Sequence, residues 1–356
     1  MNEEVAEYRN KNRKKLLWMS ILFVAMIVVA TYSICVTQYS ISFSRAIVVI
    51  INHINGEEPQ DYWGRLEKFI VIDSLCPRAV GGVLVGLILG ICGTLMQSTI
   101  RNPLADPYTT GISSGALLGV TLFTVFGFSV IPSADENVGL IVSAFSFALI
   151  PCILVISISS FKRVTSTTIV LIGIAVMYVF NAFSTLIRYT ASDEDVASIY
   201  AWSVGLLGRM NWESSVYLFI VFILLFVISI YAANTLNVLA MEDKMCSALG
   251  VNPQRTRLFI MVIVAVATAT AVCFVGTIGF IGLIAPHIGR IFVGSDNKYL
   301  IPASAIIGAF ILISADSVAR IITTTGLPVG VVTSAIGGPI FLIILLRQRK
   351  SAWGDH

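Results

Sequence analysis

The chain has 356 residues, of which 56% are hydrophobic and only 12% are charged, with a formal net charge of +3. A soluble globular protein carries about 25% charged residues, so this composition excludes an ordinary soluble domain. Uncharged runs of about 20 residues indicate a membrane protein with many spans. Because these runs lack the alternation of barrel strands, the expected class is all-α and polytopic.

Taken in chain order, the apolar runs predict ten transmembrane helices in a single domain, residues 16–347. Tails of residues 1–15 and 348–356 flank this domain, and a polar segment, 38–78, follows the first span. The expected spans are Leu16–Val36, Ala79–Ile100, Tyr108–Phe128, 138–160, 168–189, 214–235, Leu258–Val275, 280–293, 301–320 and 328–346.

The distribution of Lys and Arg predicts the orientation. An even number of spans places both termini on one side, and the segments of that side hold 16 of the 23 basic residues, including Lys162 and Arg163. Cytoplasmic loops are enriched in Lys and Arg, so both tails and residues 236–257, between spans six and seven, are expected in the cytoplasm.

Small residues recur every four positions in two spans. Gly82, Gly86 and Gly90 share one face of the second span, and the third span repeats the pattern at 111, 115 and 119. Such faces allow close backbone contact, and packing within the chain is their expected role. The six cysteines form no C-x-x-C pair and are expected to be packing residues.

The segment 236–257 is short and polar between two apolar runs. A helix is expected at Met245–Leu249, because Gly250 can end it and Pro253 opposes its continuation. Two interpretations remain open: a plain connection between spans, or a helical knob that another protein grips.

Few residues have the pattern of a chemical site. There is no P-loop and no H-E-x-x-H, and three scattered histidines do not predict a metal site. Asp316 and Arg320, four residues apart, predict an ion pair that is either a helix-end pair or an outer gate or docking point. His287 follows Pro286 in a broken helix, where hydrogen-bonded packing is favoured over a proton relay.

Several motifs together resemble the permease family of ABC importers for iron-siderophores, haem and cobalamin. The resemblance covers about Pro77–Arg347, and its two specific blocks are RNPLADP at 101–107 and GTIGFIGLIAPHIGR at 276–290. The further matches are Pro77-Arg78, Gly93-x-x-x-Gln97, the Gly111–Ala116 block, Trp202-x-x-Gly205, ALGVNPQRTR at 248–257, Ala315-Asp316-x-x-Ala319-Arg320 and LPVGVVTSAIGGPIFLIILLR at 327–347.

The resemblance implies a type II ABC importer permease with ten spans, paired with an identical or paralogous permease around a central pathway. A cytoplasmic ABC ATPase dimer, which binds ATP and Mg, would sit on the segment between spans six and seven. The matching coupling residues are Ala248, Leu249, Gly250, Val251, Asn252 and Arg255. No cofactor is expected in the chain itself.

The resemblance also implies an extracytoplasmic substrate-binding protein or lipoprotein that docks on Arg78 and Arg320. The family often has R-x-P-R where this chain has Leu75-Cys76-Pro77-Arg78, so one docking arginine is missing. The remaining motif or pathway residues are Gln97, Asn102, Pro103, Asp106, Pro107, Pro286, His287 and Asp316.

The expected function is that of a permease subunit in a bacterial cytoplasmic membrane, carrying an iron chelate, with ferric siderophore the commonest cargo in the family. Haem and cobalamin are open alternatives, and no nucleic-acid partner is expected. A secondary transporter driven by an ion gradient is the alternative from another class. It requires acidic residues within spans, and Asp316 is the only acid placed well inside one. An intramembrane hydrolase lacks a recognisable catalytic set.

Overall fold

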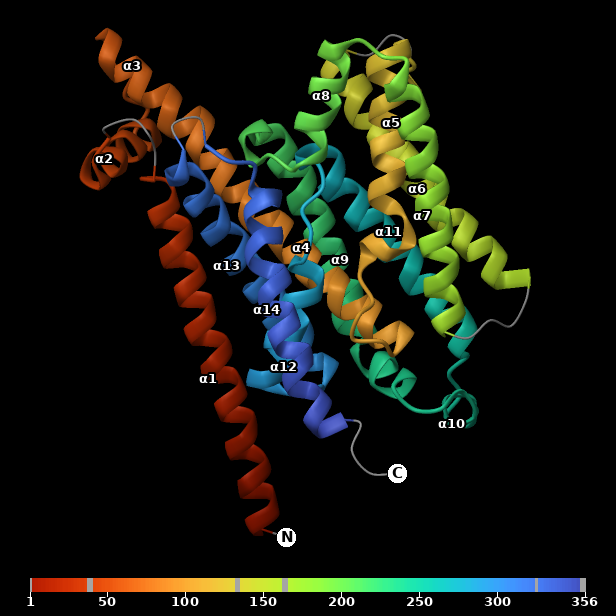
Figure 1. Ribbon diagram of the computed structural model, residues 1–356. Coiled ribbons are helices and arrows are strands. Elements are labelled where there is room, and N and C mark those ends of the chain that lie inside the picture. The colour runs from red at the N-terminus through yellow and green to blue at the C-terminus, as the bar shows by residue number, and fades with distance from the viewer. Residues whose placement is uncertain (1, 37–40, 132–134, 162–165, 324–325, 353–356) are drawn as a thin grey trace.

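The computed structural model describes residues 2–36, 41–131, 135–161, 166–323 and 326–352, and every regular element among them is helical (Figure 1). The α-helices are α1 Asn2–Ser33, α2 Phe43–Ile54, α3 Tyr62–Lys68, α4 Cys76–Ile100, α5 Ile112–Phe126, α6 Glu136–Phe161, α7 Ser166–Tyr189, α8 Asp193–Ser203, α9 Trp212–Leu239, α10 Asp243–Ala248, α11 Pro253–Val275, α12 Ile281–Val293, α13 Asn297–Ile322 and α14 Val329–Ala352. A π-helix, Phe69–Leu75, and short 3₁₀ turns, Pro107–Thr110 and Leu207–Arg209, lie between them.

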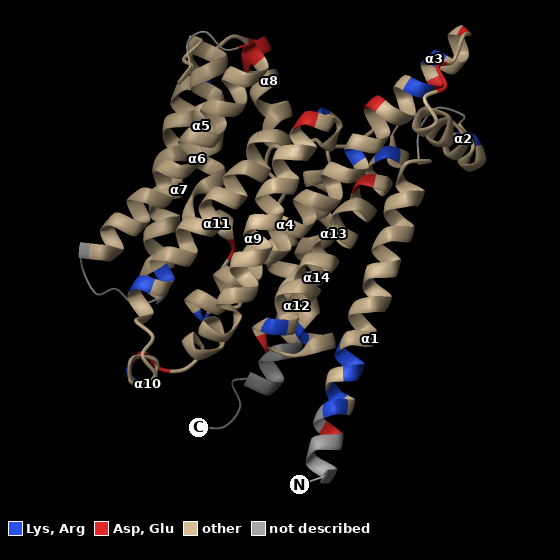
Figure 2. Ribbon diagram, turned by 180° about the vertical axis from the view of Figure 1, so that it is seen from behind, with Lys and Arg blue, Asp and Glu red and all other residues tan. Residues whose placement is uncertain are grey.

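The all-α membrane class is confirmed. Seven of the described helices are long and apolar enough to cross a membrane, and the third, eighth and tenth predicted spans coincide with shorter apolar segments: α5, α12 and Val329–Ile343 of α14. Charged residues gather at the two ends of the bundle and leave its middle almost uncharged (Figure 2). The number ten and the orientation of the bundle remain predictions.

Helices extend into two segments that were predicted only as polar. Helix α1 begins at Asn2, so the described part of the expected N-terminal tail is helical, and Lys11 and Glu7 form a 2.8 Å ion pair one turn apart there. The polar segment 38–78 contains α2 and α3, and α3 continues through the π-helix into α4 as one helical stretch from Tyr62 to Ile100. The basic residues Lys162 and Arg163 lie outside the described residues.

Helix α4 is the central helix, and glycines set how closely α13 approaches it. A Cβ atom built on Gly86 would lie 2.5 Å from Cα of Ala309, and one on Gly90 would overlap the carbonyl of Ser304. On the α13 side, Gly308 is in equally close contact with the backbone of Gly86. The predicted role of the small-residue face, packing within the chain, is confirmed.

The third span uses its glycines in the same way. Cβ atoms on Gly115 and Gly119 of α5 would overlap the carbonyl oxygens of Phe147 and Ser143 of α6. Pro151, inside α6, contacts Gly115 and Gly111. The helices α5 and α6 therefore form a second tightly packed pair beside the α4–α13 pair.

The outer helices differ from this core by their exposure. Helix α7 exposes Leu171, Tyr178 and Leu186 by 60 to 68%, and α9 exposes Tyr231 by 84%. Large apolar side chains on the outside of an otherwise well-packed bundle are typical of surfaces that contact lipid or another membrane subunit.

Two interruptions in the helices bring distant motifs together inside the bundle. Helix α4 ends at Arg101, which has a left-handed φ of 53°, and the chain returns toward α12 before α5 begins. Helix α12 starts after Phe280, also left-handed with φ 69°. The backbone of Gly282 at the start of α12 lies against Gly93 of α4, a position that has no room for a side chain.

Candidate functional site

The segment between α9 and α11 forms a compact helical knob, residues 240–252, with α10 at its centre (Figure 1). Gly250 has φ 81°, which favours glycine, and lets the chain reverse after α10. Asn252 then begins α11, because its side chain accepts the backbone N–H of Arg255 at 3.1 Å. The helix predicted at Met245–Leu249 is confirmed; it begins two residues earlier and ends one residue earlier than predicted.

The knob presents an apolar face. Met245 and Leu249 are 59% and 58% exposed, and their spacing of four residues places them on one side of α10. Around them the predicted coupling residues Ala248, Gly250, Asn252 and Arg255 are exposed, and Val251 is half-buried. Exposed methionine and leucine on a short, capped helix form a surface suited to another protein.

One buried cysteine attaches this knob to the end of α9. Cys246, fully buried, points its Sγ atom at the carbonyl oxygens of Val238 and Met241, at 3.1 and 3.5 Å. Together with the other cysteines of the described chain, which are all free, it acts as a packing residue as predicted.

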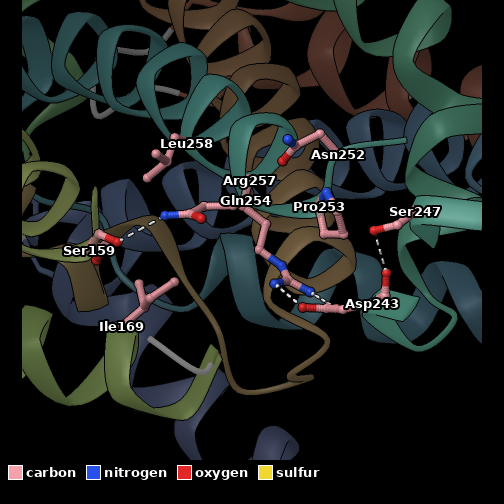
Figure 3. Close-up of a pocket in the computed structure, with 9 residues that line it drawn as sticks. All are labelled: Ser159, Ile169, Asp243, Ser247, Asn252, Pro253, Gln254, Arg257 and Leu258. Carbon is pink, nitrogen blue, oxygen red and sulfur yellow. Dashed lines mark hydrogen bonds and ion pairs between the residues drawn. The ribbon is translucent and has the colours of Figure 1, made fainter. Parts of the chain in front are cut away.

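A second attachment, which the sequence analysis missed, is ionic. Asp243 of α10 accepts two hydrogen bonds from the guanidinium of Arg257 at the start of α11, at 2.7 and 3.0 Å (Figure 3). Arg101, at the end of α4, also pairs with Asp243. Arg257 in turn donates to the carbonyl of Thr99 at 3.3 Å. Asp243 therefore connects the knob to both α11 and the central helix α4.

The electrostatics of this cluster follow from two cations around one carboxylate. Burial lowers the pKa of Arg101 below its ordinary value, and the positive charge of Arg257 lowers that pKa further. The side chain of Asp243 remains 54% exposed, whereas that of Arg257 is 8% exposed. The carboxylate thus offsets part of the cost of holding Arg257 inside the protein.

A pocket of about 280 Å³ lies beside this cluster and joins the knob to α6 and α7. Gln254 reaches across it and donates to the carbonyl of Ser159, near the end of α6, at 3.4 Å. Figure 3 shows the lining residues Ser159, Ile169, Asp243, Ser247, Asn252, Pro253, Gln254, Arg257 and Leu258. The start of α11, next to the knob, is therefore tied to α6 as well as to the end of α4.

The RNPLADP block forms the turn that returns the chain toward the middle of the bundle. Asn102 accepts the backbone N–H of Leu104 at 2.9 Å, and Asp106 begins the 3₁₀ turn in which Pro107 is the first residue. Pro103 is exposed, whereas Asp106 is 6% exposed and lies against Gly282 of α12. These residues position α5 and α12.

Gln97 fastens α4 to the interrupted helix α12. Its amide NH₂ donates to the carbonyl oxygens of Gly282 and Leu283 at 3.4 and 3.3 Å, and its amide oxygen accepts from Arg290 at 2.6 Å. Two of these three bonds go to carbonyl groups in the first turn of α12, and the carbonyl of Gly282 lacks its usual helical partner because Pro286 has no N–H.

His287 lies with Pro286 in the buried face of α12. It is 1% exposed, its Nδ1 atom is 3.0 Å from the carbonyl oxygen of Leu283, and its ring meets that of Phe341 edge-on at 5.6 Å. This geometry supports the packing interpretation over a proton relay.

At the opposite end of the bundle, Asp316 is fully buried between two arginines. It pairs with Arg320 at 3.1 Å, as the spacing predicts, and with Arg78 of α4 through bonds of 2.7 and 3.1 Å, which the spacing could not show. Arg320 also donates to the carbonyl of Val36 at 2.8 Å. The two arginines expected to dock a partner are thus held on one carboxylate, with side-chain exposures of 21% and 8%.

The sites therefore lie at three levels: an exposed knob tied ionically to the core, an interrupted pair of helices in the middle, and a buried ionic cluster at the far end. This arrangement, on a bundle with an almost uncharged middle, is that of a multi-pass helical membrane protein.

Comparison with known proteins identifies the kind of permease. The FecCD transport family profile matches residues 21–347, and the chain belongs to this family. It is 34% identical over 351 residues to a Methanocaldococcus jannaschii protein described as an ABC transporter permease, covering 97% of this chain and 98% of the relative. It is 35% identical over 279 residues to the hemin transport permease HmuU of Yersinia pestis, covering 78% of this chain and 83% of the relative.

The fold agrees with that assignment. A solved structure described as an inward-facing metal-chelate type ABC transporter superposes with a TM-score of 0.79 at 28% identity, covering 92% of this chain and 98% of that one. Further relatives are named as import permeases for iron(3+)-hydroxamate and vitamin B12. The chain is an ABC transporter permease of the cytoplasmic membrane, and its relatives are named for several different cargoes.

Proposed function

We propose that the chain is the permease subunit of a binding-protein-dependent importer that carries an iron chelate, with a ferric siderophore as the cargo, and that ATP hydrolysis on a separate subunit drives it. The observation that carries this proposal is the knob: an exposed apolar helix, fixed by Asp243 to α4 and α11, on a chain that has no P-loop. Haem and cobalamin are the alternative cargoes.

The coupling follows from the connections of the knob. A cytoplasmic ATPase dimer grips Leu249 and the surrounding residues, and closure of the dimer displaces α10. The Asp243 cluster passes that displacement to α4 and α11, and the close glycine contacts make α13 move with α4 as a rigid body. The ATPase shifts the equilibrium between inward and outward states only through contacts that differ between them.

On the extracytoplasmic side, a substrate-binding protein docks through Arg78 and Arg320. The buried cluster supports this assignment because two arginines and one aspartate leave one positive charge in excess. An acidic side chain on the binding protein would then bind Arg78, the more exposed of the two, through donors that Asp316 does not use. A second permease copy or a paralogue completes the pathway.

An ion-gradient transporter is the second candidate, and the ionic cluster disfavours it. Such a transporter needs a carboxylate that binds and releases a cation, and Asp316, the acid predicted inside a span, is instead held by two arginines. Uptake in vesicles separates the two functions. We expect uptake to require ATP and to survive collapse of the proton and sodium gradients, and uptake that stops with the gradients would refute the proposal.

The identity of the cargo is tested by purifying the complex and measuring which ligand its binding protein binds. The chain is isolated in mild detergent, the co-purifying subunits are identified, and the binding protein is loaded with ferric siderophore, haem or cobalamin. Tightest binding of a ferric siderophore supports the assignment, and preference for haem or cobalamin replaces it with that alternative.

A further inference from the structure

A crevice of about 920 Å³ opens between α6 and α9 at the end of the bundle opposite the knob, with the end of α11 as its floor. Figure 1 shows α11 passing between these two helices. The crevice lies apart from the ionic cluster of Asp316 and from the knob. Its volume is near the upper limit of the ~300–1,000 Å³ usual for pockets that take small molecules.

The depth of the crevice matches one leaflet of a bilayer. Its walls extend over residues 137–145 of α6 and 213–221 of α9. Each wall is thus about 12 Å of helix at ~1.5 Å per residue, close to half of a hydrocarbon core of ~30 Å. The crevice therefore runs from the membrane surface toward the bilayer midplane.

The lower walls of the crevice are apolar and aromatic. Tyr217 of α9 stacks on Phe274 of α11, with ring centroids 6.2 Å apart and planes within 9°, and Phe145 lines the α6 side. Parallel rings beside branched aliphatic side chains such as Ile220 form a smooth surface for a hydrocarbon chain.

The mouth of the crevice is polar, and its charges are unpaired. Arg209 and Glu213 both line it, and neither forms an ion pair or a side-chain hydrogen bond within the described residues. Asp135 lines it as well, and its carboxylate accepts the backbone N–H of Asn137 at 3.3 Å. Trp202, 1% exposed, also lines the crevice, and its buried indole N–H has no hydrogen-bond partner in the described chain.

From these features we infer that the crevice binds a membrane phospholipid whose headgroup carries both a phosphate and a primary ammonium group, as phosphatidylethanolamine does; the quaternary ammonium of phosphatidylcholine has no N–H donor for the carboxylates. Arg209 binds the phosphate, because guanidinium and phosphate form strong charge-assisted hydrogen bonds. Glu213 and Asp135 receive the ammonium group, and their negative charge disfavours a purely anionic headgroup. An acyl chain occupies the aromatic walls below.

The test is native mass spectrometry of the full-length chain, purified in mild detergent with its bound subunits from bilayers that mix phosphatidylethanolamine, phosphatidylcholine and phosphatidylglycerol of identical acyl chains. We expect phosphatidylethanolamine to be retained at least fivefold over the other two lipids. Arg209→Gln and Glu213→Gln should each abolish that preference. Arg188→Gln is the matched control, because Arg188 lies at the same end of the bundle on α7, outside the crevice, and should retain it.

Equal retention of the three lipids, or the same retention in Arg209→Gln as in Arg188→Gln, would overturn the inference. If Arg209→Gln fails to fold, Val138→Trp fills the crevice from α6 without changing charge and should also lose the bound lipid. Disulfide cross-linking between two copies through Tyr217→Cys would show that a second permease covers the crevice, and this would also overturn it.

Discussion

Replacing Asp243 by asparagine tests whether the knob drives the membrane helices through the ionic cluster. The substitution keeps the size of the side chain and removes the charge that Arg257 and Arg101 share. Breaking a buried ion pair costs about 3–5 kcal/mol, whereas a surface pair is worth only about 0.2–1 kcal/mol.

The Asp243 cluster lies between these limits, because the Arg257 side chain is 8% exposed and that of Asp243 is 54% exposed. A loss of about 2 kcal/mol is therefore expected. Since about 1.4 kcal/mol is a factor of ten in an equilibrium constant, coupled transport should fall about 10- to 30-fold.

The assay compares ATP hydrolysis with substrate uptake in proteoliposomes that contain the complete importer. Asp243→Asn should hydrolyse ATP and bind the ATPase normally but transport poorly, and Asp243→Glu should recover part of the transport. Lys244→Gln is the control, because it neutralises the neighbouring charge, and Lys244 takes part in none of the ion pairs of the described chain. Normal transport by Asp243→Asn would refute the linkage, and loss of ATPase binding would make Asp243 a contact residue instead.

Three further changes test other parts of the molecule. Gly250→Arg should abolish uptake while membrane insertion stays normal. The control Gly294→Arg, at an equally open position with the same φ of 81°, should transport normally. Equal uptake by both variants would contradict the role of the knob. Arg78→Gln should weaken binding of the substrate-binding protein, more at low than at high ionic strength, as measured by surface plasmon resonance; unchanged affinity at low salt would exclude Arg78 as a contact. Gly90→Leu should reduce the fraction of folded protein, measured by size-exclusion chromatography, because the leucine side chain would overlap the backbone of Ser304. A stable, monodisperse variant would contradict the α4–α13 packing.

Much of the fold was accessible from the sequence because spans are long uncharged runs and helix contacts need small residues. The glycines at every fourth position of α4 and α5 are in close contact with α13 and α6, as expected. The start of the second helical stretch was not predicted, since residues 38–78 contain enough charged residues to resemble a loop. Their helices are stabilised by pairs such as Arg45–Glu67, at 2.7 Å, which separation in sequence hides.

The site was predicted where neighbours in space are also neighbours in sequence. Asp316 and Arg320, one helical turn apart, form the expected pair, and the residues around Leu249 form the expected knob. The partnerships of Asp243 with Arg101 and of Asp316 with Arg78 join residues more than 140 positions apart. Single-sequence patterns contain no information on such pairs, and whether Arg78 and Arg320 dock a partner remains a prediction.

The crowding around α4 has a consequence for how this scaffold could acquire a different cargo. Its glycines admit no larger side chain against α13, and Gln97 is committed to three bonds with α12. A change of cargo would therefore have to come from residues outside this packed core, and α7 and α14 hold several large apolar side chains that are more than half exposed. Altered cargo selectivity should therefore be sought first in a library of variants confined to those two helices.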